Sequence, residues 1–281
     1  MPNSKVEEIV FLNGKFIAKD KAMVSVWEPG FLYGWGLFET MRAYQEKIIY
    51  FDAHLARIKN SCVPLLMQFP YPLNKLKGII RKLIKINGFT DTYLRLTLWK
   101  TESVTATLII CRKYKPYSPL KYRKGFMAGL SSFRQNENYP FAQLKTTNYL
   151  FYQLAYQEAK RSGFDEAIIL NNRGFIAEGS RSNLFFIKDN QLFTPSLECG
   201  CLSGITRKVI FDLAKQRRIK IEEGRFTLEN LYNAEGAFLT NSLMGVMPLA
   251  SLAGKPIAKG KVDGLTRFLT KKYNQLLKNG I

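Results

Sequence analysis

Residues 176–187 read Ile-Ala-Glu-Gly-Ser-Arg-Ser-Asn-Leu-Phe-Phe-Ile, so an acid and several small polar residues lead directly into an apolar run. The run 184–187 predicts a buried strand, because short apolar segments bounded by turn residues are typical of one. Glu178 has two interpretations. It is either a turn residue, the more frequent role in isolation, or a carboxylate held in a site where it pairs with a cationic ring nitrogen.

The rest of the chain predicts two domains of strands and helices. We expect strands at 9–12, 15–17, 37–44, 47–50, 92–98, 105–111, 126–132, 166–170, 183–187 and 236–240. We expect helices at 52–67, 73–87, 149–162, 204–217 and 263–278. Hairpins with helices grouped between them indicate an α/β (mixed α+β) fold, not a doubly wound parallel sheet. The basic, proline-containing stretch 112–125 lacks periodicity. This stretch therefore predicts a division into an N-terminal domain at 1–115, a linker at 116–124 and a C-terminal domain at 125–281.

Composition excludes several classes of protein. The 281 residues include 46% hydrophobic ones, which is too many for a disordered chain. The N-terminal residues lack a signal-peptide pattern, and no apolar run approaches the roughly 20 residues of a membrane helix, so we expect a cytoplasmic protein without a membrane partner. With one His and four Cys lacking a CxxC pair, we expect no metal site. The 42 Lys and Arg against 22 Asp and Glu give a net charge of +20, which raises the possibility of nucleic-acid binding.

Three further segments could carry chemistry. Gly34-Trp35-Gly36 is not a dinucleotide-binding fingerprint, because extended chain follows it in place of a helix. The small residues at 203–206 open a helical pattern, which suits either an ordinary cap or a phosphate bound by free backbone amides. Lys145 is either one of many surface lysines or a Schiff-base lysine.

Taken in order along the chain, these segments resemble the class IV aminotransferases, which are fold-type IV pyridoxal-phosphate enzymes. The resemblance rests on residues 30–42, 54–57, 145–150, 165–167, 178–185, 204–207 and 240–248. It covers the chain from about residue 13 to about residue 249. The resemblance implies a two-domain fold like that of D-amino-acid aminotransferase, with pyridoxal 5'-phosphate between the domains, and a homodimer.

The resemblance also implies roles for individual residues. Lys145, in the C-terminal domain, would bind the cofactor as a Schiff base and move the substrate α-proton. Glu178 would face the pyridine nitrogen, and Tyr149 would bond the ring oxygen. The remaining cofactor ligands would hold the phosphate: Arg57, the backbone amides of Ile205 and Thr206, and the hydroxyl of Ser242.

The choice among family members depends on a few departures from their motifs. The strand at 95–100 lacks the Arg-x-His pair of the D-amino-acid enzymes, which disfavours that substrate. Phe38-Glu39-Thr40 and Asn241-Ser242-Leu243 differ from the branched-chain enzymes and resemble 4-amino-4-deoxychorismate lyase, a folate-biosynthesis enzyme that releases pyruvate and p-aminobenzoate. In that enzyme the residue matching Thr40 assists proton transfer.

The lyase is therefore narrowly favoured over an amino-acid aminotransferase, although its Arg-Gly is replaced here by Trp99-Lys100. Tyr33, Arg95 and Lys100 are the candidate substrate-binding residues. A basic nucleic-acid-binding protein remains the alternative from another class. We expect no nucleic-acid partner, because the basic residues are spread along the chain and form no known binding motif.

Overall fold

The computed structural model describes residues 8–279, which form two compact units. The first unit holds the described residues up to Lys115 together with the short segment 144–148. The second unit holds residues 116–143 and the described residues from Tyr149 onward. Lys145 therefore clusters with the first unit, whereas the sequence placed it in the second domain. No helix within residues 8–279 is both long and apolar enough to cross a membrane.

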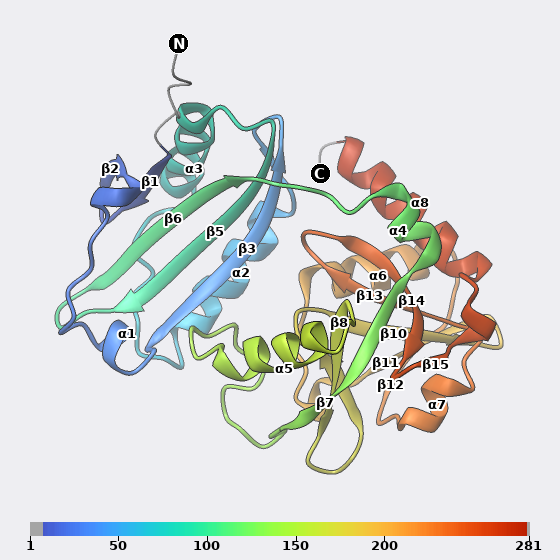
Figure 1. Ribbon diagram of the computed structural model, residues 1–281. Helices are drawn as coiled ribbons and strands as arrows, with labels where there is room; N and C mark the ends of the chain where they lie inside the picture. The colour runs from blue at the N-terminus through green and yellow to red at the C-terminus, as the bar shows by residue number, and fades with distance from the viewer. Residues whose placement is uncertain (1–7, 280–281) are drawn as a thin grey trace. The chain divides into compact units, whose positions relative to one another are not determined.

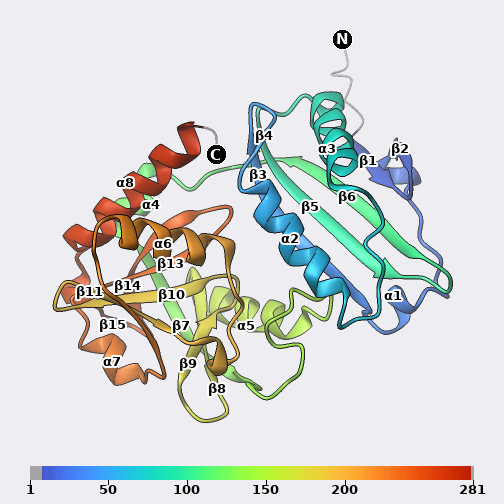
Figure 2. The same ribbon diagram turned by 180° about the vertical axis from the view of Figure 1, so that it is seen from behind.

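The first unit is an antiparallel sheet with helices on one face (Figure 1). In the described part its six strands run in the order β2-β1-β6-β5-β3-β4. Their bounds are β1 (Ile9–Leu12), β2 (Lys15–Ala18), β3 (Gly36–Tyr44), β4 (Lys47–Ile48), β5 (Asp91–Lys100) and β6 (Thr105–Lys113). The helices are the short α1 (Pro29–Leu32), α2 (Phe51–Cys62) and α3 (Leu73–Asn87). Figure 2 shows α2 and α3 lying across one face of the sheet.

Strand alternation decides which side chains of β3 and β5 face these helices. Successive side chains on a strand point to opposite faces. On β5 the buried Leu94, Leu96 and Leu98 alternate with half-buried polar residues. The leucines pack toward the helices, which present Leu55, Ile58, Leu76, Ile80 and Leu83 as fully or almost fully buried side chains. The polar residues between them occupy the opposite face of the sheet.

The helix predicted at 52–67 is shorter than expected and ends at Cys62. Residues 63–66 form a turn, and Leu66 has a φ of 52°, in the left-handed region that ends a helix. The apolar residues at 63–67 continue the helical spacing of the residues before them. The spacing alone therefore does not show that the helix ends at Cys62.

The second unit contains a mixed sheet of nine described strands (Figure 1). Parallel pairs join β7 to β8, β7 to β14 and β11 to β12, and the other pairs are antiparallel. The strands are β7 (Phe126–Gln135), β8 (Glu166–Asn171), β9 (Ile176–Gly179), β10 (Asn183–Lys188), β11 (Gln191–Pro195), β12 (Ile221–Gly224), β13 (Gly236–Asn241), β14 (Gly245–Leu252) and β15 (Lys255–Pro256). The helices are α4 (Pro119–Lys124), α5 (Leu150–Arg161), α6 (Ile205–Gln216), α7 (Leu228–Tyr232) and α8 (Gly264–Asn279).

The second unit has apolar packing on both faces of β8. Ala167 and Ile169 pack with Ala155 and Ala159 of α5. Ile168 and Leu170, which alternate with them, join a larger cluster built on β10, β13 and β14. Because β8 is buried throughout, its sequence reads as a continuous apolar run and not as an alternating one.

The stretch 116–124, expected as an unstructured linker, contains the short helix α4. Ser118 caps this helix by accepting a hydrogen bond from the Lys121 amide, and Pro119 occupies its first turn. A helix of 6 residues is too short to produce the apolar periodicity on which the sequence prediction depends.

Candidate active site

The segment that carries Lys145 lies against the edge of β3 in the first unit. The amide of Phe38 donates to the Lys145 carbonyl at 2.9 Å, and the amide of Thr147 donates to the Gly36 carbonyl at 2.9 Å. Leu37 and Thr146 form an antiparallel bridge between these bonds. The segment thus acts as a short extra strand, and the backbone of β3 fixes where the lysine side chain begins.

Gly34 and Gly36 allow this close approach. The Gly34 carbonyl accepts from the Thr147 hydroxyl at 2.6 Å and from the Asn148 amide group at 3.1 Å. A Cβ on Gly36 would lie 2.7 Å from the Leu98 carbonyl oxygen and 2.9 Å from the Thr147 hydroxyl. Any side chain at position 36 therefore collides with backbone, which explains the glycine physically.

The side chain of Lys145 shares one sheet face with two other predicted site residues. Its Nζ lies 4.5 Å from the centroid of the Phe38 ring, and the guanidinium of Arg95 lies 3.7 Å from the same centroid. Thr40, two residues beyond Phe38, is in direct cross-strand register with Arg95. Lys145, Thr40 and Arg95 thus gather around one aromatic ring on the face opposite α2 and α3.

The other two candidate substrate residues lie elsewhere in the first unit. Tyr33 is the C-cap residue that follows the short helix α1, and it is 71% exposed. Lys100 is at the end of β5, where strand alternation directs it away from the face that carries Arg95. Neither joins the group around Phe38.

Arg57 belongs to a buried cluster on the helix-covered face. Its guanidinium makes two bonds of 2.7 Å to the two carboxylate oxygens of Glu39, and His54 Nδ1 lies 2.7 Å from Glu39 Oε2. Burial raises the pKa of Glu39, but the charge of Arg57 and the bond to His54 outweigh it and hold the pKa at about 2. The sequence did not single out Glu39, although it is adjacent to Thr40 in the first motif.

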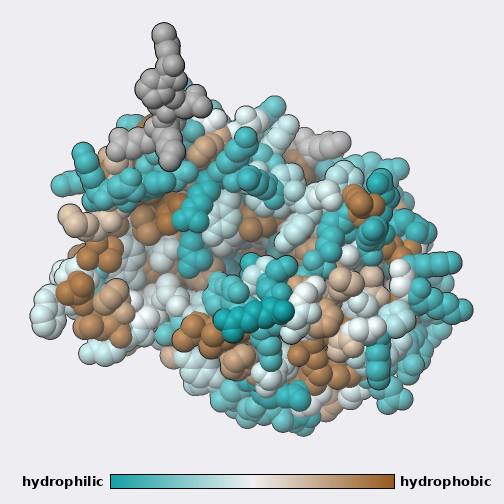
Figure 3. All heavy atoms as spheres, in the orientation of Figure 1, coloured by the Kyte–Doolittle hydropathy of each residue, from teal (hydrophilic) through white to brown (hydrophobic). Residues whose placement is uncertain are grey.

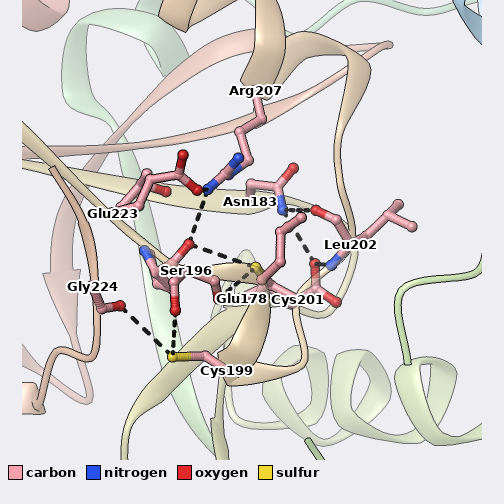
Figure 4. Close-up of polar contacts among 12 residues, drawn as sticks. Glu178, Asn183, Ser196, Cys199, Cys201, Leu202, Arg207, Glu223 and Gly224 are labelled. Carbon is pink, nitrogen blue, oxygen red and sulfur yellow. Dashed lines mark hydrogen bonds and ion pairs between the residues drawn. The ribbon is translucent and has the colours of Figure 1, made fainter. Parts of the chain in front are cut away.

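Glu178 is the centre of a second group, in the second unit (Figure 4). It is the next-to-last residue of β9 and is 5% exposed. Its Oε2 accepts from the amide of Leu202 at 3.1 Å and from the side-chain amide of Asn183 at 3.3 Å. Its Oε1 accepts from the Tyr152 hydroxyl at 3.1 Å. Neutral donors from three segments therefore fix the orientation of its carboxyl group.

Tyr149 and Tyr152 are stacked beside this carboxylate. Their ring centroids are 4.9 Å apart with 26° between the planes, and the Tyr149 hydroxyl donates to the Ser180 carbonyl at 3.0 Å. Burial, followed by the charge of Glu178, raises the pKa of Tyr152 well above its usual value, so that the hydroxyl stays a donor. Sequence reasoning missed Tyr152; its position three residues after Tyr149 on a helix was the available signal.

The third part of the candidate site is the start of α6, which follows Gly204. The N-cap residue Gly204 has no side chain that could cap the helix, and the start of a helix offers backbone amides that suit an anion. Any Cβ on Gly204 would overlap Asn183 Oδ1, which ties the start of the helix to the residue that also contacts Glu178. The hydroxyls of Thr206 and Thr240 are buried and lack a hydrogen-bond partner within the described chain. Asn183 pairs with Thr240 across β10 and β13.

The predicted residues therefore assemble in two places, each within one unit. Lys145, Thr40 and Arg95 form one group, and Arg57 binds Glu39, the residue before Thr40 on β3. Glu178 and the helix start at Ile205 and Thr206 form the other, joined through Asn183. Ser242 lies in the turn between β13 and β14, where Asn241 Oδ1 accepts from the amides of Leu243 and Met244. No cluster of three or more metal-binding side chains occurs between residues 8 and 279.

Comparison with known proteins gives consistent matches over nearly the whole chain. The model of the family described as Amino-transferase class IV matches residues 36–252. The branched-chain-amino-acid aminotransferase of Pseudomonas aeruginosa is 30% identical over 285 residues, which cover 96% of this chain and 92% of that protein. The aminodeoxychorismate lyase of Bacillus subtilis is 29% identical over 286 residues, which cover 97% of this chain and 96% of that protein.

The fold agrees with solved structures. The branched-chain amino acid aminotransferase of Escherichia coli superimposes with a TM-score of 0.90 at 26% identity, covering 96% of this chain and 94% of that one. The expected fold-type IV architecture, with two sheets, is thereby confirmed.

Proposed function

The chain belongs to the amino-transferase class IV family, and we propose that within this family it acts as a 4-amino-4-deoxychorismate lyase. Enzymes of this family use pyridoxal 5'-phosphate. Two features of the second unit fit that cofactor. The start of α6 after Gly204, with the buried Thr206 hydroxyl, suits a phosphate group. Glu178, held by neutral donors, suits a protonated ring nitrogen.

Each proposed role follows from the group that the residue offers. Pyridoxal phosphate, when bound, supplies an electron sink for the substrate carbon that bears the amine. Lys145 Nζ takes and returns the proton at that carbon, and its backbone pairing with β3 fixes its direction of approach. Glu178 keeps a proton on the ring nitrogen. Arg57, the amides of Ile205 and Thr206, and the Ser242 hydroxyl bind the phosphate, and Tyr149 bonds the ring oxygen.

The position of Thr40 is our reason for favouring the lyase over the aminotransferase. Its side chain lies on the same face of β3 as Phe38, the ring that Lys145 and Arg95 contact. A hydroxyl there can pass a proton to the leaving enolpyruvyl group, while Arg95 binds a substrate carboxylate. The proton leaves the amine-bearing ring carbon, the neighbouring C–O bond breaks, and pyruvate departs as the ring becomes aromatic.

A branched-chain aminotransferase is the second candidate. It is favoured by the names of the relatives, since the Pseudomonas protein and the Escherichia coli structure are both such enzymes. The two reactions share proton removal by Lys145 and differ in the next step: the lyase would break the neighbouring C–O bond, whereas an aminotransferase would break no such bond and would return the proton.

Two assays on the protein loaded with pyridoxal phosphate separate these functions. The first supplies 4-amino-4-deoxychorismate and measures p-aminobenzoate and pyruvate. The second supplies leucine, isoleucine or valine with 2-oxoglutarate and measures glutamate. We expect turnover in the first assay, with Thr40→Ala slower and Thr40→Ser close to wild type. Turnover in the second assay alone would assign the chain to the aminotransferases.

We further propose that the protein works as a homodimer in the cytoplasm. The first unit exposes several large apolar side chains in the segment before β3: Met23, Val24, Val26, Trp27, Phe31, Leu32 and Tyr33. Exposed apolar side chains that gather into a patch are typical of an interface between protein chains.

A further inference from the structure

Glu39 is one of the most thoroughly enclosed charged groups in the first unit. It is 0% exposed, and His54 beside it is 1% exposed. The carboxylate comes from β3, whereas both of its partners come from one face of α2, where His54 and Arg57 are three residues apart. Three bonds of 2.7 Å join the residues.

The geometry of the ion pair fixes the plane of the Arg57 guanidinium. Nε binds one carboxylate oxygen and one terminal nitrogen binds the other, in the two-point arrangement that guanidinium and carboxylate adopt. Because Glu39 is ionised, its oxygens can only accept, so His54 Nδ1 must carry the hydrogen that it shares with Glu39. His54 thus restrains the carboxylate, and the carboxylate restrains the arginine.

We propose that Glu39, restrained by His54, is a positioning residue that orients the Arg57 guanidinium for the phosphate of the cofactor. The inference rests on the proposed function, in which Arg57 binds that phosphate. A long flexible arginine loses rotamer freedom on binding, so a side chain held in place by a buried partner binds more tightly. The benefit is specific to the phosphate, because Glu39 acts through Arg57.

The test compares two ligands that differ only in the phosphate. Pyridoxal 5'-phosphate and pyridoxal carry the same aldehyde, and absorbance reports their reaction with Lys145. We expect Glu39→Gln to raise the dissociation constant of pyridoxal phosphate about tenfold, the range for a lost hydrogen bond to a charged group. The dissociation constant of pyridoxal should not change.

The first unit offers a matched control. Arg42 and Asp91 form a second two-point pair on the same sheet, with bonds of 2.8 and 2.6 Å. Asp91→Asn should leave the ratio of the two dissociation constants at the wild-type value. In an Arg57→Gln background, Glu39→Gln should cause no further loss of pyridoxal phosphate affinity.

Three results would overturn the inference. Equal weakening of both ligands would make Glu39 merely structural, and unchanged affinities would give it no role. Wild-type protein that takes up neither ligand would overturn the proposed function as well. If Glu39→Gln does not fold, Glu39→Asp keeps the charge with a shorter reach, and it must show the same loss confined to pyridoxal phosphate.

Discussion

The hydroxyl of Tyr152 is one of the hydrogen-bond donors that orient Glu178. It donates to Oε1, while Asn183 and the Leu202 amide hold Oε2. Tyr152→Phe removes one donor without changing the ring that stacks on Tyr149. We expect turnover to fall about tenfold to a hundredfold, because a hydrogen bond to a charged group is worth about 1.5–3 kcal/mol.

A second tyrosine provides the comparison for this prediction. Tyr122 in the same unit donates to the Met244 carbonyl at 2.7 Å and has no proposed role in the reaction. Tyr122→Phe should leave turnover unchanged. Equal turnover in both variants, measured with saturating cofactor, would remove Tyr152 from the site.

The low pKa of Glu39 predicts how the stability of the folded protein depends on pH. Its pKa is about 2 in the folded protein against 4.5 ordinarily, so its contribution to stability is complete above about pH 4.5 and disappears as the pH falls toward 2. A shift of this size corresponds to about 3 kcal/mol. Thermal unfolding midpoints of wild type and Glu39→Gln should therefore converge between pH 4.5 and 2. Curves that stay parallel across this range would contradict the assignment.

Among the structural elements, the edge of β3 gives the most specific prediction. Gly36→Ala introduces a Cβ 2.7 Å from the Leu98 carbonyl, so the lysine segment or β5 must shift. We expect a loss of cofactor absorbance at a given pyridoxal phosphate concentration. Gly78→Ala in α3 is the matched change, because its Cβ meets no atom within 4 Å and alanine favours helix. Full cofactor absorbance in Gly36→Ala would show that this contact does not position Lys145.

Long periodic elements could be predicted from the sequence, and short ones could not. The helices at α3, α5 and α6 and the strands β5 and β10 lie close to the expected ranges, because apolar spacing over many residues records burial. Strands β9, β11, β12, β14 and β15 were not predicted. Most are short, and pairing with distant strands stabilises them more than local preference does.

The residues of the site also fall into those that the sequence could identify and those that it could not. Motif resemblance selected Lys145, Glu178 and the start of α6, because small residues and acids there leave a recognisable order in the sequence. Tyr152 and Asn183 were missed, because the spacing of Tyr152 from Tyr149 does not show that Tyr152 meets the same carboxylate as Asn183. Glu39 was missed for the same reason: only the pairing of β3 with α2 brings it to Arg57.

For the whole molecule, the exposed apolar segment before β3 predicts the oligomeric state. Trp27 is 77% exposed and Phe31 is 63% exposed. Charging both, as Trp27→Asp with Phe31→Asp, should convert a dimer to a monomer in light scattering. Leu120→Asp, on the exposed helix α4, should not. A wild-type protein that is monomeric at assay concentrations would contradict the proposed dimer.

The net charge of +20 is not explained by the proposed site. Arg57 and Arg95 are engaged locally, and together with Lys145 they account for only a small part of the total. Figure 3 shows hydrophilic residues distributed over the visible faces of both units, not gathered over one element. A distributed charge can attract anionic substrates over a distance, an effect that salt weakens.

The most direct test of the central claim is to find where pyridoxal phosphate attaches. The protein is loaded with the cofactor, reduced with borohydride, digested and analysed by mass spectrometry. We expect a pyridoxyl phosphate group on Lys145 and on no other lysine, and we expect Lys145→Ala to stay unlabelled and colourless. Labelling of another lysine at the same yield, or a wild-type protein that takes up no cofactor, would contradict it.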